Sequence, residues 1–281
     1  MTVALPPSGP LPARATQPRA QGESRIAVRL GPDGRTLLSK LYQQGSAKIL
    51  LPTARDPALE AVLLNTSGGI TGGDRISCEG RAEAGARLVL TTQAAERLYK
   101  SWPDETPGRL STRLSIGPGA RIDWLPQETI AFDRSALHRS LDVEMAADAT
   151  FLALEPIILG RTAMGERVHS IRLRDHWRVR RDGRLIYADA LRLEGPALEA
   201  LAGPATLGGG FAFASMLFVA PGAEDLLTPL RARLEGIGAA SARDGFVSMR
   251  LVAPDGLALR RCILDTLGLL LGRALPRVWH M

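Results

Sequence analysis

Apolar and polar residues alternate along much of the chain from Arg25 onward, in short runs separated by turn residues. The run RIAVRL is followed by the turn sequence GPDGR and then by TLLSKLYQQGSAKILL. Side chains of a strand point alternately to its two faces, so a period of two between Gly, Pro and Asp residues indicates antiparallel strands. The pattern therefore predicts a mainly β protein.

Three stretches in the middle of the chain resemble one another, each with a strand, a turn of small residues and a second strand: 75–93, 112–127 and 139–156. Ala120 follows Ala86 by 34 residues and precedes Ala149 by 29, while Gln93 and Gln127 each lie seven residues beyond their alanine. Repeats of roughly 20 to 50 residues are typical of solenoids, in which each unit buries its apolar face against its neighbours. We expect a β-helix-like stack of short strands, with an ordinary sandwich of hairpins as the alternative.

Later segments predict two hairpins and about two flanking α-helices. Asp182-Gly183 and Asp255-Gly256 each follow a run of alternating residues, which is typical of a tight β-turn. The segment 223–238 has acidic residues at its start and a glycine at its end, and 260–275 repeats apolar residues at helical spacing.

The first 24 residues are rich in proline and small polar residues and show no apolar period, so they predict a disordered tail. Residues 25–281 are then expected to form a single β domain. The tail has no continuous apolar stretch of the kind found in a secretory signal. The sequence has no run of about 20 apolar residues, so no membrane span is predicted.

The chain of 281 residues is 45% hydrophobic, with a net charge of +6 that comes almost entirely from arginine, since only Lys40, Lys48 and Lys100 are lysines. Arginine binds carboxylates and phosphates, so acidic protein surfaces and nucleic acid are both possible partners. The absence of long basic runs and of an aromatic-basic motif disfavours nucleic acid. The two cysteines, Cys78 and Cys262, are far apart in sequence, which predicts neither a disulfide framework nor a thiolate metal site and fits a reducing cytosol.

The glycine-rich segment 65–74 (NTSGGITGGD) is the most conspicuous motif. Its glycine pairs, Gly68-Gly69 and Gly72-Gly73, could expose backbone amides to an anion, but the spacing matches no nucleotide-binding fingerprint. We interpret it as a tight corner that permits close packing. Motifs of serine hydrolases and zinc enzymes are also missing from the sequence, which argues against an enzyme.

Carboxylates are spread singly along the chain, and two of them lie in apolar surroundings. Glu155 is flanked by apolar residues in FLALEPIILG, and Glu128 stands between WLPQ and TIAF. A buried carboxylate needs a partner, because leaving it unpaired is costly. For Glu155 we expect Arg161 to be that partner.

The motifs together resemble the UreD family of urease accessory proteins, in order and over nearly the whole chain after the tail. Residues 65–74 are similar to that family's glycine-rich segment, 91–101 (TTQAAERLYKS, with Gln93 and Tyr99) to its "TTQAA" segment, and 125–128 (LPQE) to its "LPQ" strand end. Residues 159–166 (LGRTAMGE, with Arg161) resemble its "GR" turn, and 275–279 (LPRVW) its closing motif.

This resemblance implies a β-helical fold, a cytoplasmic and non-catalytic protein, and a complex with UreF and, through UreF, UreG on apo-urease. It also implies that nickel passes through an internal channel, with Ni²⁺ in transit and no tightly bound cofactor. By motif position, the carboxylates expected to line that channel are Asp74, Glu155 and Asp189, followed by Glu128 and Glu166.

Two departures from the family pattern are visible: Thr66-Ser67 stands in place of two prolines, and Glu96 replaces a small or hydroxyl residue. An extra acid could alter ion passage. A delivery path should offer isolated oxygen ligands, because imidazole and thiolate groups hold nickel tightly. The alternatives are a scaffold that changes urease conformation without contacting nickel and a basic β protein that binds nucleic acid, whose binding would weaken steeply with salt.

Overall fold

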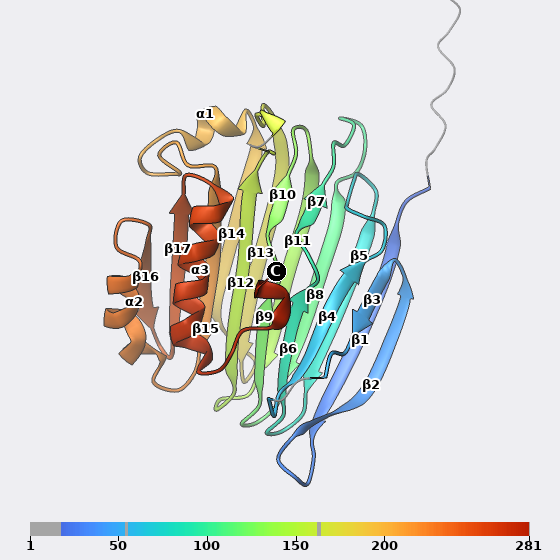
Figure 1. Cartoon of the computed structure of the whole chain (residues 1–281), viewed down its shortest axis with the longest axis vertical. Coiled ribbons are helices and arrows are strands. Elements are labelled where there is room, and N and C mark those ends of the chain that lie inside the picture. Colours follow the sequence, from blue (N-terminus) through green and yellow to red (C-terminus); the bar gives the residue numbers. More distant parts are fainter. Residues whose placement is uncertain (1–17, 54–55, 162–163, 281) are drawn as a thin grey trace, which may run out of the picture.

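The computed structural model describes residues 18–53, 56–161 and 164–280 of the chain. Two β-sheets face each other, and helices cover the outer side of one of them (Figure 1). The seven-stranded sheet has the order β14 (Arg184–Gly195), β13 (Ile171–Arg181), β11 (Ala136–Met145), β8 (Gly108–Ile116), β5 (Arg75–Ala82), β1 (Gln21–Leu30) and β2 (Thr36–Gly45).

The ten-stranded sheet has eight strands in a continuous order and two short ones beside them. The order is β16 (Gly238–Arg243), β17 (Phe246–Ala253), β15 (Ala212–Val219), β12 (Thr150–Leu159), β9 (Arg121–Leu125), β6 (Arg87–Thr92), β4 (Leu59–Asn65) and β3 (Ala47–Leu50). The short strand β10 (Thr129–Ala131) pairs with β12 and with β7 (Glu96–Leu98).

The centre of the molecule winds between the two sheets. Strands β5, β8, β11 and β13 pair in parallel in the seven-stranded sheet, and β6, β9 and β12 pair in parallel in the other. In chain order the strands of one set alternate with those of the other, which confirms the predicted β-helix-like stack. Antiparallel strands such as β2, β14 and β15 flank this core.

The predicted repeat sets the register of the stack. The Arg121 backbone N–H donates to the Ala86 carbonyl at 2.9 Å, and that of Thr150 donates to the Ala120 carbonyl at 2.9 Å. The turns stack as well, since the Gly119 N–H donates to the Asp148 carboxylate at 3.0 Å. The strand starts spaced 34 and 29 residues apart are therefore neighbours in space.

One predicted turn is confirmed and the other is wrong. Asp182 and Gly183, both at positive φ, join the antiparallel strands β13 and β14 as expected. Asp255 instead caps a helix: its backbone is extended and its side chain accepts from the Ala258 N–H at 2.8 Å. An Asp-Gly pair fits a helix start as well as a hairpin, and the apolar residues that follow at helical spacing decide for the helix.

Three α-helices are present in the described part of the chain: α1 (Ala197–Leu201), α2 (Leu227–Arg233) and α3 (Gly256–Leu271). The last two correspond to the predicted helices, although α3 begins earlier than expected, and the five-residue α1 was not predicted. The chain closes with a short 3₁₀ helix, Arg277–His280, over the outer face of the ten-stranded sheet (Figure 1). No helix among the described residues is long and apolar enough to cross a membrane.

The β structure begins before the predicted boundary. Residues 1–17 of the predicted tail lie outside the described residues. The last four residues of that tail, 21–24, belong to β1, which pairs in parallel with β5 from Gln21 onward. Ser24 is buried between the sheets although it is polar. The prediction missed this part of β1 because it relied on apolar residues to identify strands.

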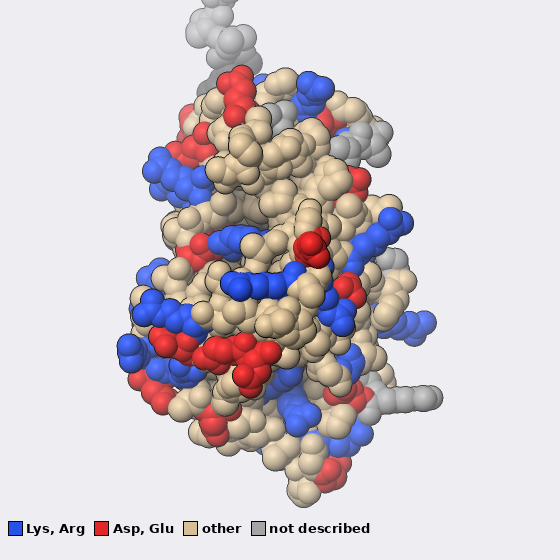
Figure 2. All heavy atoms as spheres, turned by 90° about the vertical axis from the view of Figure 1, so that its left-hand side faces the viewer, with Lys and Arg blue, Asp and Glu red and all other residues tan. Residues whose placement is uncertain are grey.

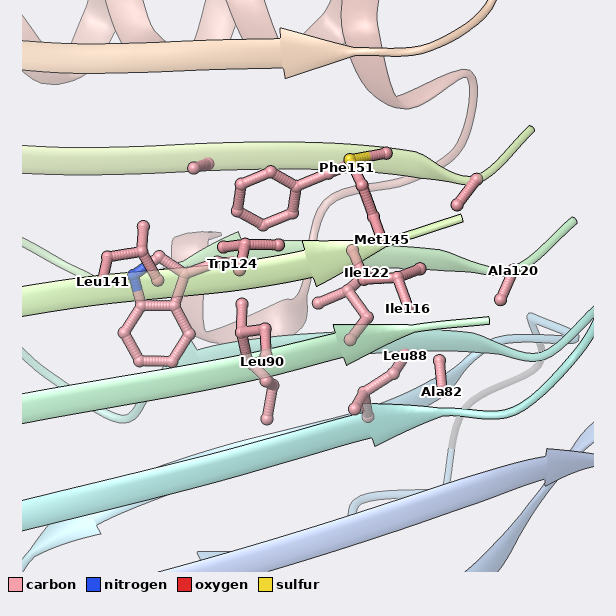
Figure 3. Packing of buried hydrophobic residues seen from close by; sticks show 14 of the residues in the cluster. Ala82, Leu88, Leu90, Ile116, Ala120, Ile122, Trp124, Leu141, Met145 and Phe151 are labelled. Carbon is pink, nitrogen blue, oxygen red and sulfur yellow. The ribbon is translucent and has the colours of Figure 1, made fainter. Parts of the chain in front are cut away.

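Apolar side chains fill the space between the sheets and beneath the helices. One cluster includes Leu90, Trp124 and Phe151 from the ten-stranded sheet, facing Leu141 and its neighbours from the other (Figure 3). A second lies between the ten-stranded sheet and the segments α2, α3 and 275–279. A third occupies the opposite end of the space between the sheets, around β7 and β10.

Candidate functional site

A cavity of about 260 Å³ lies between the two sheets. Its wall is mostly apolar, but the buried side chains that border it include Ser24, Cys78, Thr112, Arg139 and Glu155. Exposed residues also border it, among them Gly68, Gln93 and Ala94. The cavity therefore runs from the surface near the end of β6 to the buried Glu155 carboxylate.

Glu155 reaches the cavity from the inward face of β12 and is 4% exposed. Its Oε1 accepts a hydrogen bond of 2.8 Å from the Trp124 indole N–H, and its Oε2 forms an ion pair with Arg139. The same guanidinium donates to the Asp175 carboxylate at 2.6 Å. Arg139 and Asp175 are register partners on β11 and β13, so the strand pairing itself brings them together.

Two buried carboxylates share one guanidinium in this cluster. Burial raises the pKa of Glu155 to about 7; the positive charge of Arg139 opposes the shift, while the negative charge of Asp175 adds to it. Asp175 Oδ1 and Arg139 Nε have no hydrogen-bond partner among the described residues. With both carboxylates ionised, the cluster carries one excess negative charge, which a proton on one of them would neutralise. It also contains polar atoms that form no hydrogen bond with the described residues.

A second acidic pair lies near the surface end of the cavity. Glu96 borders the cavity, and burial raises the pKa of its carboxyl group, with the Asp74 charge adding to the shift and hydrogen bonding from Asn65 opposing it. Asp74 is buried and accepts from the Ala20 N–H at 2.7 Å and the Thr71 N–H at 2.8 Å. Asp74 therefore fixes the backbone of the turn and stands close enough to Glu96 to influence its charge.

The glycine-rich segment forms the tight corner that the sequence predicts. The Asn65 amide donates to the Gly69 carbonyl at 3.0 Å, and the Tyr99 hydroxyl donates to the Gly68 carbonyl at 3.3 Å. A Cβ at Gly69 would lie 2.3 Å from the Tyr99 ring, so only glycine allows this approach. At Gly72 a Cβ would come within 2.6 Å of a carboxylate oxygen of the following loop.

Asp189 lies at another side of the space between the sheets and does not border the cavity. Its carboxylate pairs with Arg250 of β17. In the ten-stranded sheet, Glu155 pairs in register with Ser215, and Ser215 with Arg250. Two strand spacings, roughly 10 Å, therefore separate Glu155 from the Arg250–Asp189 pair, with buried Ser215 between them.

The two remaining predicted acids are held elsewhere. Glu128 accepts from Arg260 of α3 at 2.9 Å, beneath the covering helix. Glu166 accepts hydrogen bonds from the Arg161 guanidinium, one of them from Nε at 2.9 Å. These hydrogen bonds are the main reason why the pKa of Glu166 is lowered. The prediction that Arg161 pairs with Glu155 is wrong, because Arg161 lies beyond the turn at Gly160 and closes that turn with Glu166.

The sequence interpretation missed Arg139, Asp175 and Trp124 as neighbours of Glu155. The alternation of inward and outward residues along the strands could have identified Arg139 and Asp175. Arg139 stands between Leu137 and Leu141, at a position where the alternation places an inward side chain, and Asp175 interrupts the inward series of β13 in the same way. A charged residue at an inward position requires a partner across the interior.

The fold and this site define a class: a β protein wound between two sheets, with a buried acid–arginine cluster beside an open cavity. Within the described residues no group of three or more His, Cys, Asp or Glu side chains could hold a metal ion. The family model of the UreD urease accessory protein matches residues 20–280. The chain therefore belongs to the UreD family, which ties it to urease maturation.

Relatives named urease accessory protein UreD match nearly the full chain. The protein from Chelativorans sp. (strain BNC1) is 51% identical over 270 residues, covering 95% of this chain and 96% of the relative. The protein from Rhizobium leguminosarum bv. trifolii (strain WSM2304) is 48% identical over 272 residues, with 96% and 98% covered. The protein from Agrobacterium fabrum is 43% identical over 266 residues, with 94% and 93% covered.

Proposed function

We propose that this protein is a non-catalytic maturation factor that guides Ni²⁺ through the space between its sheets while it holds apo-urease with UreF and, through UreF, UreG. The observation that carries the proposal is the Glu155 carboxylate, which is buried and yet borders a cavity that reaches the surface. Family membership supplies the link to urease. We place this activity in the cytoplasm.

The ligand chemistry favours passage over storage. Each additional ~1.4 kcal/mol of binding free energy slows release of the ion about tenfold, so a path must avoid deep binding sites. The mostly apolar wall offers carboxylate and hydroxyl oxygens singly, and the Cys78 thiol stays protonated because burial raises its pKa to about 11. A neutral thiol is a poor nickel ligand, so it does not trap the ion.

The proposed route has three parts: acidic residues at the surface end of the cavity, the buried Glu155 carboxylate, and the polar side chains beyond it. Glu96, with Asp74 behind it, attracts the ion at the surface end, and Glu155 receives it in the interior. Beyond Glu155 the polar row through Ser215 leads toward Asp189 and Arg250. A divalent cation beside Glu155 favours the ionised carboxylate, so the proton that burial stabilises leaves as the ion arrives.

Paired substitutions test the proposal against a pure scaffold. Glu96→Gln and Glu155→Gln remove a charge from the route with little change in shape, and Glu144→Gln removes one from the outer face of β11 as a control. We expect urease matured with either route variant to contain less nickel, while the complex co-purifies intact and the control behaves as the unchanged chain. Full nickel loading with both route variants would favour the scaffold.

The remaining alternative, nucleic-acid binding, receives no support from the cavity, because its basic residues Lys48, Arg97 and Arg139 are accompanied by Glu96 and Glu155 and most of its wall is neutral. Binding of an oligonucleotide at low salt, with the steep salt dependence of phosphate contacts, would revive it.

A further inference from the structure

The outer face of the seven-stranded sheet carries a row of basic side chains that runs across the strands. Arg75, Arg109, His138, Arg174 and Arg192 are successive register partners on β5, β8, β11, β13 and β14. We call these five residues the arginine row. Like charges on directly opposed positions repel each other, so this arrangement costs stability unless an anion binds there.

The neighbouring positions of the same face show that the imbalance is local. The next outward row is neutral or weakly basic: Ser77, Ser111, Ser140 and His176. In the row after it, Arg113 pairs with Glu79, and Arg178 pairs with Asp142 at 3.2 Å. Charges there are compensated across the strands. The narrow side of the molecule around α2 and β16 likewise mixes both signs (Figure 2).

Compensation of the arginine row is confined to one end. Glu194 pairs with Arg174 at 2.7 Å and with Arg192 at 2.5 Å. Among the described residues, the side chains of Arg75 and Arg109 form neither an ion pair nor a hydrogen bond, and both are exposed. A surface depression borders both arginines and also contains the Glu23 side chain, which pairs with Arg25.

The pKa of His138 responds to the electrostatic potential of its basic neighbours. Its pKa is lowered, mainly by burial and then by the positive charges of Arg174 and Arg109, with a smaller contribution from His176 and an opposing one from Glu194. Burial and, after it, the neighbouring positive charges therefore disfavour the charged form of the imidazole at the centre of the row. The uncompensated positive charge of the row therefore lies at Arg75 and Arg109, at the end of the row opposite Glu194.

We infer that the arginine row is a docking surface for an acidic α-helix of a partner protein, lying across the strands. The row spans four strand spacings, about 19 Å, which matches a helix of roughly 13 residues. Carboxylates at every third or fourth helical position rise by about 4.5 to 6 Å, close to the ~4.8 Å between strands. In an extended peptide, residues on the same face are about 6.6 Å apart, which does not match the ~4.8 Å spacing of the strands.

A nucleic acid fits this surface less well. The strip is one residue wide, and the acidic residues Glu79 and Asp142 lie about 13 Å along the strands, where a duplex would meet them. Neither the arginine row nor the serine-rich row beside it contains a Phe, Tyr or Trp side chain on which a base could stack. The inference concerns a surface distinct from the cavity and holds whether or not nickel passes between the sheets.

The test uses the full chain and a labelled helical peptide of alanine with glutamate at every third or fourth position. Charge reversal at Arg75→Glu with Arg109→Glu should weaken peptide binding about tenfold or more at low salt. The double variant Arg81→Glu with Arg113→Glu, on the same two strands and with the same change in net charge, should leave binding nearly unchanged. A peptide with lysine in place of glutamate should bind the first variant better than it binds the unchanged chain.

Circular dichroism of each variant shows whether it is folded. Equal losses in both double variants would overturn the inference, because binding would then depend on net charge alone. Lack of peptide binding to the unchanged chain would also overturn it. So would tighter binding of an oligonucleotide of the same charge, which would assign the surface to nucleic acid.

Discussion

The indole N–H of Trp124 donates a hydrogen bond of 2.8 Å to Glu155 Oε1, and both side chains border the cavity between the sheets. This contact, with Arg139 on the other oxygen, holds the carboxylate in place. In the proposed function, an arriving cation has to displace or share these partners, and this competition keeps the cation weakly bound.

Replacing Trp124 with phenylalanine tests the structural part of this contact. The substitution leaves a ring in the cluster but removes the donor to a buried carboxylate oxygen. We expect the free energy of unfolding to fall by about 1–3 kcal/mol, because a buried acceptor is left unsatisfied. Urea denaturation measures this, with Trp102→Phe at an exposed position as the matched control. Equal losses in the two variants would show that the hydrogen bond contributes little.

Stability should depend on pH through Glu155. Its pKa is raised from 4.5 in the unfolded chain to about 7 in the fold, so between these values the folded state binds more protons than the unfolded state. The stabilisation is present below about pH 4.5 and is lost as pH rises through about 7. Relative to Glu155→Gln, the unchanged chain should therefore lose stability across this window in denaturation series. A constant difference between the two proteins would contradict the assignment.

The corner at the mouth of the cavity predicts unequal effects of two neighbouring glycines. Both have positive φ, but a Cβ at Gly68 meets open space, whereas one at Gly69 meets the Tyr99 ring at 2.3 Å. Gly68→Ala should cost roughly 1–2 kcal/mol for the left-handed backbone alone. Gly69→Ala should cost about 2 kcal/mol more, because the ring must move. Thermal unfolding of the two variants provides the comparison, and the reverse order would contradict the close packing of Gly69 against the Tyr99 ring.

Local patterns predicted the parts of the fold that local sequence determines. The spacing of Ala86, Ala120 and Ala149 gave the stacking of the strands because each turn must repeat its geometry to stack on the last. The Asp182-Gly183 turn followed from its flanking alternation. Asp255-Gly256 was assigned wrongly, since the same dipeptide begins a helix when apolar residues follow at helical spacing.

The site was harder to predict, because its partners come from different strands. Glu155 was correctly seen as a buried acid in need of a partner, but Arg139 meets it only through the winding of the chain between the sheets. The arginine row likewise depends on the register of five strands, which no single segment encodes. Asp189 was chosen by motif position. It forms an ion pair with Arg250, which lies two strands from Glu155 in the ten-stranded sheet.

The most direct test of the central claim is the nickel content of urease matured with a chain whose cavity is blocked at its mouth. Ala94→Trp places a large side chain at the exposed end of the cavity, and Ala84→Trp places one in the exposed turn at the other end of β6. The account predicts several-fold less nickel per urease with Ala94→Trp than with Ala84→Trp, with the accessory complex intact in both. Full nickel loading with Ala94→Trp would contradict passage through this cavity.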